Sequence, residues 1–290
     1  MSTLRSWILA SRPKTLVAAA VPVMVGAALA REAAAEHWPF ALCALLAALC
    51  IQIGTNFAND YSDFRRGTDA QRIGPTRVTQ SGLIAPERVK DGAILAFTLA
   101  TVFGLFLVLR GGWPIMAIGI LGMIFGWLYT GGPYPLGYHG LGEVFVFVFF
   151  GLAAVAGTHY VLTLEWNPIS LLVAIAPGLH ASALLAVNNV RDIDTDRAAG
   201  KRTLAVMHGR TFARWEYLLL CTLPFVVPVI LALIGFSAWV LLSLLAMPLV
   251  IAPVRLVFTQ TDGPSLIRAL AVTARLQLVF GILLSLGLLL

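Results

Sequence analysis

Charged side chains are scarce in this sequence. Asp, Glu, Lys and Arg together account for 12% of its 290 residues, whereas a soluble globular domain carries about 25%. Hydrophobic residues make up 59% of the chain, and the mean hydropathy is +0.88. These values argue against a soluble enzyme of this length, a disordered chain and a collagen-like chain. They predict a polytopic membrane protein.

Cysteine is also scarce, and no pair of cysteines has the spacing of a metal or redox site. Cys43, Cys50 and Cys221 all lie in apolar stretches, where a free cysteine packs as a small apolar residue. His159 and His180 lie in or near apolar runs without an HExxH pattern. We therefore interpret all five side chains as packing residues rather than metal ligands.

Acidic residues are fewer than basic ones, 14 against 20, which gives a net charge of +6. In a soluble protein, this excess would suggest nucleic acid as a partner. In an apolar chain, basic residues instead mark the cytoplasmic loops of a membrane protein. We therefore predict contact with a lipid bilayer and no nucleic-acid partner.

Apolar runs bounded by charged residues, Gly and Pro predict an all-α fold, a bundle of nine transmembrane helices. We expect residues 1–290 to form a single transmembrane domain with two Asp-rich loops on the cytoplasmic side. The approximate spans are 15–30, 40–58, 92–110, 113–130, 141–163, 168–188, 212–234, 237–257 and 270–290.

The distribution of basic residues predicts the orientation of this bundle. If the N-terminus is cytoplasmic, only Arg31 and Arg110 of the 20 Lys and Arg residues lie on the outer side. This bias predicts a cytoplasmic N-terminus and, with nine spans, a C-terminus outside.

Two acidic clusters follow the inner ends of the second and sixth predicted spans, at 56–63 and 188–196. Their oxygen-bearing residues are spaced so that each set lies on one face if its helix continues. The first set is Asn56, Asp60 and Asp63, and the second is Asn189, Asp192 and Asp196. A solvated helix end would explain one such cluster, but two matched clusters favour a functional site.

Carboxylate and amide oxygens suit Mg²⁺, which typically completes its coordination with water and substrate phosphates. Basic residues near both clusters, which include Arg72, Arg77, Arg191 and Lys201, fit metal-bridged binding of a diphosphate. A diphosphate site at the mouth of an apolar bundle predicts a substrate with a charged head and an apolar tail, such as a polyprenyl diphosphate.

An ion-coupled transporter is the alternative from another functional class, because carboxylates near the membrane also serve there. The acidic clusters lie at the mouth of the bundle rather than at its midplane. The sequence also has no pair of broken helices in matching halves. Both features favour an enzyme.

Several stretches of the sequence resemble the UbiA-type intramembrane prenyltransferases, and most closely the branch that prenylates 1,4-dihydroxy-2-naphthoate. The stretches are residues 12–16 (RPKTL), 59–63 (NDYSD), 72–77 (RIGPTR), 134–138 (YPLGY), 140–143 (GLGE) and 188–203. The two-residue gap between Asp60 and Asp63 also resembles this branch, and it shifts Asp63 around the helix relative to the three-residue gap common in the broader superfamily.

The resemblance implies Mg²⁺-dependent transfer of a polyprenyl group to 1,4-dihydroxy-2-naphthoate, with loss of CO₂ and diphosphate, to give demethylmenaquinone. Another acceptor, 4-hydroxybenzoate or homogentisate, remains an alternative. The resemblance also implies an active site open to the cytoplasm and a location in the bacterial cytoplasmic (inner) membrane.

Roles for individual residues follow from the clusters and the resemblance together. Metal ligands are expected to be Asp60, Asp63, Asp192 and Asp196. Diphosphate-binding residues are expected to be Asn56, Arg72, Arg77, Asn189, Arg191 and Lys201. The acceptor is expected to contact Lys14, Tyr129, Tyr134 and Tyr138, and Glu143 is expected either to hold a loop or to bind a cation.

Overall fold

The structure, a computed structural model, describes residues 3–68, 74 and 76–290. Its regular elements are all helical within these residues, which confirms the predicted fold class. In chain order, the first half contains α1 (Thr3–Ser11), α2 (Pro13–Leu29), α3 (Arg31–Glu36), α4 (Trp38–Arg66), α5 (Pro86–Leu128), η1 (Leu136–Tyr138), α6 (Gly142–Phe147), η2 (Val148–Ala153) and α7 (Ala154–Thr163). The second half contains α8 (Pro168–Ala198), α9 (Leu204–Thr222), η3 (Leu223–Phe225), α10 (Val226–Leu233), η4 (Ala238–Val250), α11 (Ile251–Thr259) and α12 (Gly263–Leu289).

The predicted count of nine spans is not confirmed. Seven helical segments of the described chain are long and apolar enough to cross a membrane, or eight if the bent pair α1 and α2 forms one span. One reason for the difference is that α5 contains two of the predicted spans, 92–110 and 113–130. Its backbone is non-helical at Gly112, with φ 66° and ψ −153°.

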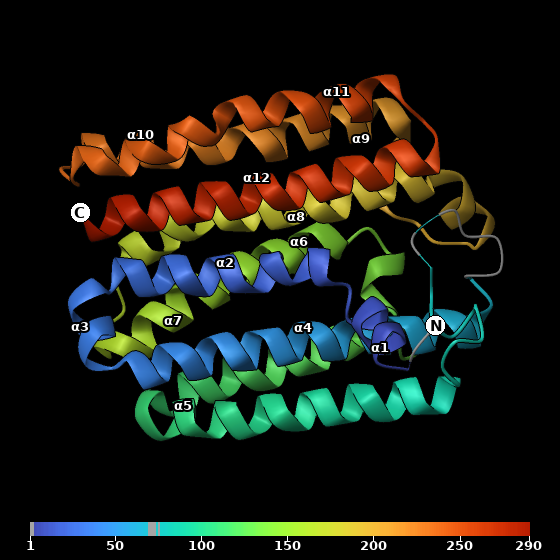
Figure 1. The fold of residues 1–290 in the computed structure, drawn as a ribbon, viewed down its shortest axis with the longest axis horizontal. Helices are drawn as coiled ribbons and strands as arrows, with labels where there is room; N and C mark the ends of the chain where they lie inside the picture. The colour runs from blue at the N-terminus through green and yellow to red at the C-terminus, as the bar shows by residue number, and fades with distance from the viewer. Residues whose placement is uncertain (1–2, 69–73, 75) are drawn as a thin grey trace.

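At this break α5 folds back on itself (Figure 1). Thr101 Oγ1 lies 3.5 Å from Met123 Sδ, so residues at similar distances before and after Gly112 are neighbours. A positive φ favours glycine, which has no Cβ to clash in that conformation. The Gly111-Gly112 pair therefore allows a very short connection between the two arms of α5.

Small residues allow the central helices to pack closely. A Cβ added to Gly151 would lie 2.8 Å from Cα of Gly178, so η2 and α8 touch through their backbones there. Similarly, a Cβ on Gly281 of α12 would overlap Val21 of α2. Close approach through glycine is a common way for membrane helices to gain packing contacts.

Both Asp-rich clusters lie at the same end of the bundle. In Figure 1, α4 and α8 run in the same direction on either side of α2 and finish at the end where α1 lies. The C-terminus lies at the opposite end. The fold thus brings together two segments that are more than a hundred residues apart in the sequence.

Candidate active site

A polar cavity of about 290 Å³ opens at the end of the bundle that carries the acidic clusters. Asp63 of α4 lies on one wall, and Asn189, Asp192 and Asp196 of α8 lie on another. Lys201, which follows α8, also lines this cavity. The structure therefore brings residues of the two clusters to one cavity.

Lys201 bridges the two clusters. Its Nζ lies 3.4 Å from Asp63 Oδ1 and 3.8 Å from Asp196 Oδ1. The Tyr138 hydroxyl donates a hydrogen bond of 2.9 Å to Asp63 Oδ1, and its ring centre is 4.7 Å from Lys201 Nζ. The ammonium group of Lys201 thus lies between carboxylates from the two clusters, where the negative charges of both attract it.

The carboxylate of Asp60 is buried and binds the loop that follows α4. It accepts hydrogen bonds from the Val78 amide at 3.2 Å and from the Thr79 hydroxyl. Arg77 on the same loop donates to Asp63 Oδ2 at 2.9 Å. Asp60 is not among the residues that line the polar cavity. In this structure, Asp60 holds the loop that brings Arg77 to Asp63.

Arg191 and Asp192 form a bidentate pair between neighbouring residues. Arg191 Nε and Nη2 donate to the two carboxylate oxygens of Asp192 at 2.7 and 2.6 Å. Both residues are buried, but only Asp192 lines the polar cavity. Such a charge-assisted fork fixes the orientation of the carboxylate.

The two predicted asparagines have different surroundings. Asn189 lines the polar cavity, and its Nδ2 donates a hydrogen bond of 2.6 Å to Glu143 Oε1. Asn56 does not line the cavity. Its Nδ2 donates to the Ser11 carbonyl at 3.0 Å and to Thr15 Oγ1 at 3.1 Å, so it binds the joint between α1 and α2.

The residues predicted to contact the acceptor do not all line the polar cavity. Lys14, Tyr129 and Tyr138 line the polar cavity. Tyr134 does not line it; its side chain is exposed and its ring stacks on His139 with centroids 3.6 Å apart. Arg72, a predicted diphosphate ligand, lies outside the described residues.

Burial raises the pKa of the Tyr129 hydroxyl and that of the Tyr138 hydroxyl above the ordinary value. The neighbouring Asp63 carboxylate raises the pKa of Tyr138 further, because a negative charge disfavours the phenolate. Both hydroxyls are therefore protonated at neutral pH and can donate hydrogen bonds.

The sequence interpretation missed several residues of the cavity wall, among them Asn59 and Arg12. Asn59 lines the cavity and accepts a hydrogen bond of 2.7 Å from Thr130 Oγ1. It lies four residues before Asp63, so helical spacing alone would have placed both on one face. Arg12 also lines the cavity, and its place in the RPKTL stretch was the available signal.

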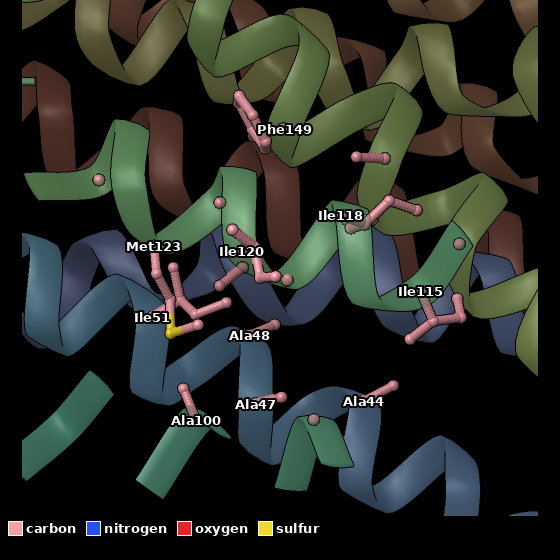
Figure 2. A pocket seen from close by; sticks show the side chains of 18 of the residues that line it. Ala44, Ala47, Ala48, Ile51, Ala100, Ile115, Ile118, Ile120, Met123 and Phe149 are labelled. Carbon is pink, nitrogen blue, oxygen red and sulfur yellow. The ribbon is translucent and has the colours of Figure 1, made fainter. Parts of the chain in front are cut away.

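A second, apolar cavity of about 370 Å³ lies between α4, α5 and the segment from α6 to α7. Figure 2 shows its lining, with Ala44, Ala47 and Ile51 of α4 on one wall. Phe149 of η2 points into it from another wall. Tyr129 lines both cavities, so the polar and apolar cavities adjoin at this side chain.

The polar cavity fits a magnesium site in which the protein supplies only a few of the ligands. Among the residues that the structure describes, no group of three or more His, Cys, Asp or Glu side chains forms a metal cluster. Mg²⁺ usually takes only one or two carboxylates and keeps waters and phosphate oxygens as its other ligands. Asp63, Asp192 and Asp196 at one cavity satisfy that requirement.

The sequence matches the profile of the UbiA prenyltransferase family over residues 19–284. Two similar curated proteins are each named 1,4-dihydroxy-2-naphthoate octaprenyltransferase. The one from Mycobacterium leprae is 39% identical over 97% of this chain and 95% of its own. The one from Escherichia coli is 37% identical over 99% of this chain and 96% of its own.

A solved structure shares the fold. A UbiA homolog from Archaeoglobus fulgidus, bound to DMAPP and Mg²⁺, superposes with a TM-score of 0.63 at 15% identity. The match covers 97% of this chain and 99% of the archaeal one. At this identity the likeness concerns the arrangement of the helices.

Proposed function

This chain belongs to the UbiA prenyltransferase family, and we propose that it prenylates 1,4-dihydroxy-2-naphthoate. In the proposed reaction, a polyprenyl diphosphate donates its prenyl group, CO₂ and diphosphate leave, and demethylmenaquinol forms, which is oxidised by air to demethylmenaquinone. The observation that carries this proposal is that the polar cavity and the apolar cavity adjoin at Tyr129. The names of relatives that match nearly the whole chain support the acceptor.

The proposed diphosphate site combines residues of the two acidic clusters with residues of the loops that follow α4 and α8. Lys201 lies between Asp63 and Asp196, and Arg77 is held at Asp63. These ion pairs support a role for Lys201 and Arg77 in binding phosphate oxygens. Asn189 lines the cavity wall and is proposed to reach the diphosphate through the cation that both share, while Arg191 fixes the carboxylate of Asp192. Arg72 keeps its predicted role as a further phosphate ligand.

We propose that Asp63, Asp192 and Asp196 hold Mg²⁺ directly or through water, since all three line the cavity. When bound, Mg²⁺ neutralises the charge that builds up on the leaving diphosphate. Asp60 remains part of the proposed site, and its hydrogen bonds to Val78 and Thr79 support a role through the loop that carries Arg77.

The apolar cavity is the proposed site of the prenyl tail. Departure of diphosphate leaves positive charge on the allylic carbon, and water would quench it. The lining of Ala, Ile, Met and Phe side chains excludes water from this carbon. The Tyr129 ring, which lies at the junction of the two cavities, can stabilise the charge by a cation–π contact.

We propose that the acceptor binds in the polar cavity beside Lys14, Tyr129 and Tyr138, all of which line it. Lys14 is the proposed partner of the naphthoate carboxylate. The carboxylate leaves as CO₂, and the electron pair of its bond restores the aromatic ring. No side chain is then needed as a base for that carbon. Tyr134 stacks on His139 outside the cavity, so it is left out of this acceptor site.

The proposed location is the bacterial cytoplasmic membrane, with the whole chain acting as one unit and the polar cavity on the cytoplasmic side. Its multiple apolar helices and the bacterial relatives support this assignment.

The test is turnover by purified protein in detergent, supplied with 1,4-dihydroxy-2-naphthoate and an allylic diphosphate, with Mg²⁺ or with EDTA. We expect demethylmenaquinone with Mg²⁺ only, together with CO₂ released from a labelled carboxylate. Folded protein that yields no product under either condition would reject the naphthoate assignment. The same assay with 4-hydroxybenzoate and homogentisate then tests the alternative acceptors.

A further inference from the structure

Glu143 is a buried acidic residue that the proposed reaction does not yet use. It lies in the first turn of α6 and is 7% exposed. Two contacts attach it to α8. Its main-chain carbonyl accepts a hydrogen bond of 3.2 Å from Ser182 Oγ, and its carboxylate Oε1 accepts one of 2.6 Å from Asn189 Nδ2. Ser182 and Asn189 are two helical turns apart, on one face of α8.

The hydrogen bond between Asn189 and Glu143 determines whether the amide oxygen or the amide NH₂ of Asn189 faces the polar cavity. Asn189 Nδ2 donates to Glu143 Oε1, so the amide NH₂ is the group that faces Glu143. The amide oxygen of Asn189 is then the atom available to the polar cavity that this residue lines. Without Glu143, the amide could rotate and present its NH₂ to the cavity instead.

The orientation of this amide matters because of its neighbours. Asn189, Asp192 and Asp196 line the same cavity from α8. An oxygen at position 189 extends that row of ligands for a cation, whereas an NH₂ group would repel it. Residues that orient metal ligands from behind typically change metal affinity by about 10–100-fold when they are removed.

We propose that Glu143 is a positioning residue for divalent-cation binding, and that it acts by fixing the amide of Asn189 with its oxygen toward the cavity. This inference rests on the proposed magnesium site and adds a residue that does not itself contact the metal. It also explains why a carboxylate is buried where the chain enters its membrane-spanning segment, Gly142–Thr163.

The experiment measures metal binding separately from turnover. Purified protein in detergent with inorganic diphosphate is titrated with Mn²⁺ as a substitute for Mg²⁺, and free Mn²⁺ is followed by electron paramagnetic resonance. We expect Glu143→Leu to weaken Mn²⁺ binding about 10–100-fold. Glu143→Gln keeps an acceptor oxygen and is expected to stay within about threefold of the parent, because its amide oxygen can receive the same hydrogen bond.

Ser182→Ala is the matched control. It removes the other hydrogen bond between α8 and Glu143 but leaves the carboxylate and the Asn189 amide in place. We expect a lower thermal-unfolding midpoint with unchanged Mn²⁺ affinity. Equal weakening by Ser182→Ala and Glu143→Leu would overturn the inference, because general loosening of this contact would then be sufficient.

Exchanging the carboxylate and the amide between positions 143 and 189 provides a second test. This test does not require the Glu143→Leu variant to fold. Asn189→Asp places two carboxylates together and is expected to weaken Mn²⁺ binding. Adding Glu143→Gln to Asn189→Asp restores a donor–acceptor pair with reversed roles, and recovery of at least about tenfold is expected.

The outcomes separate this inference from the proposed function. A parent that binds no Mn²⁺ would overturn both. A parent that binds Mn²⁺ while folded Glu143→Leu binds it equally tightly would overturn the role of Glu143 alone. That role would also be overturned if the double variant with Asn189→Asp and Glu143→Gln bound Mn²⁺ no more tightly than Asn189→Asp alone.

Discussion

At the scale of single residues, the acidic side chains of the two clusters differ in environment more than in type. Asp63 meets Arg77, Tyr138 and Lys201 at once, whereas Asp194 is 73% exposed in its side chain. We expect a carboxylate at the cavity wall to act on the substrate, whereas an exposed one is screened by water. Position in the tertiary structure is therefore expected to decide which carboxylates matter for turnover.

Asp192→Asn is expected to lower turnover by about 10²–10³-fold. The substitution removes a negative charge at the cavity wall and with it a proposed ligand for the cation that would stabilise the leaving diphosphate. The measurement is the initial rate of prenyl transfer in membranes with matched protein abundance. Retained turnover would contradict the proposed metal role.

Asp194→Asn is the control for this substitution. Asp194 pairs with Arg197 at 3.4 Å and with Arg210 at 3.2 Å and does not line the polar cavity. Exposed ion pairs contribute little to stability, so turnover within about twofold of the parent is expected. A large loss here would mean that charge near the loop, rather than a ligand at the cavity, is what turnover requires.

At the scale of secondary-structure elements, the joint between α1 and α2 links the N-terminus to the acidic cluster on α4. The helices meet at an angle of 50°, and Arg12 between them has a left-handed backbone, with φ 50° and ψ 68°. Such a conformation is unfavourable for a residue other than glycine and needs support from its surroundings. The amide of Asn56 supplies part of that support through Ser11 and Thr15.

Asn56→Ala is expected to destabilise the protein by about 1–3 kcal/mol, because the acceptors at the joint lose their buried donor. Turnover should fall, since Arg12 and Lys14 beside the joint line the cavity. The Mg²⁺ concentration that gives half-maximal turnover should stay within about twofold of the parent. Thermal unfolding and a Mg²⁺ titration measure the two effects, and a shift of about tenfold or more in the titration would instead support direct metal or phosphate contact.

The hairpin of α5 is the other element that shapes the site, because glycines on both arms line the apolar cavity. A Cβ built on Gly119 meets no atom within 4 Å, so a larger side chain there would extend into open cavity. Gly119→Leu is therefore expected to raise the KM for long-chain allylic diphosphates by about tenfold or more. The KM for dimethylallyl diphosphate should change little.

Ala117→Leu is the matched control on the same arm, because Ala117 does not line the cavity. Steady-state kinetics with a series of chain lengths would measure both variants. An equal effect of Gly119→Leu on short and long donors would contradict the assignment of this cavity to the prenyl tail.

At the scale of the whole molecule, the arrangement of the termini gives a further test. The N-terminus and C-terminus lie at opposite ends of the bundle (Figure 1), and the acidic cavity lies at the N-terminal end. Alkaline phosphatase is active only outside the cytoplasm, so we expect a C-terminal fusion to it to be active and a C-terminal fluorescent-protein fusion to be dark. The reverse pattern would contradict the orientation predicted from the basic residues.

The class of this protein and the position of its acidic clusters follow from local features of the amino-acid sequence. Apolar runs of span length leave the backbone no alternative to helices in a bilayer, so composition and periodicity predict an all-helical membrane protein. Helical spacing likewise places Asp192 and Asp196 on one face of α8. These inferences succeeded because they depend only on neighbours along the chain.

The contacts of the polar side chains depend on the packing of distant helices. Lys201 meets Asp63 from a distant segment, Asn56 turns to the α1–α2 joint, and Glu143 faces Asn189 across two helices. None of these contacts follows from local periodicity, because each depends on how helices far apart in sequence pack. The depth and lining of the apolar cavity arise in the same way, from the spaces that several packed helices leave between them.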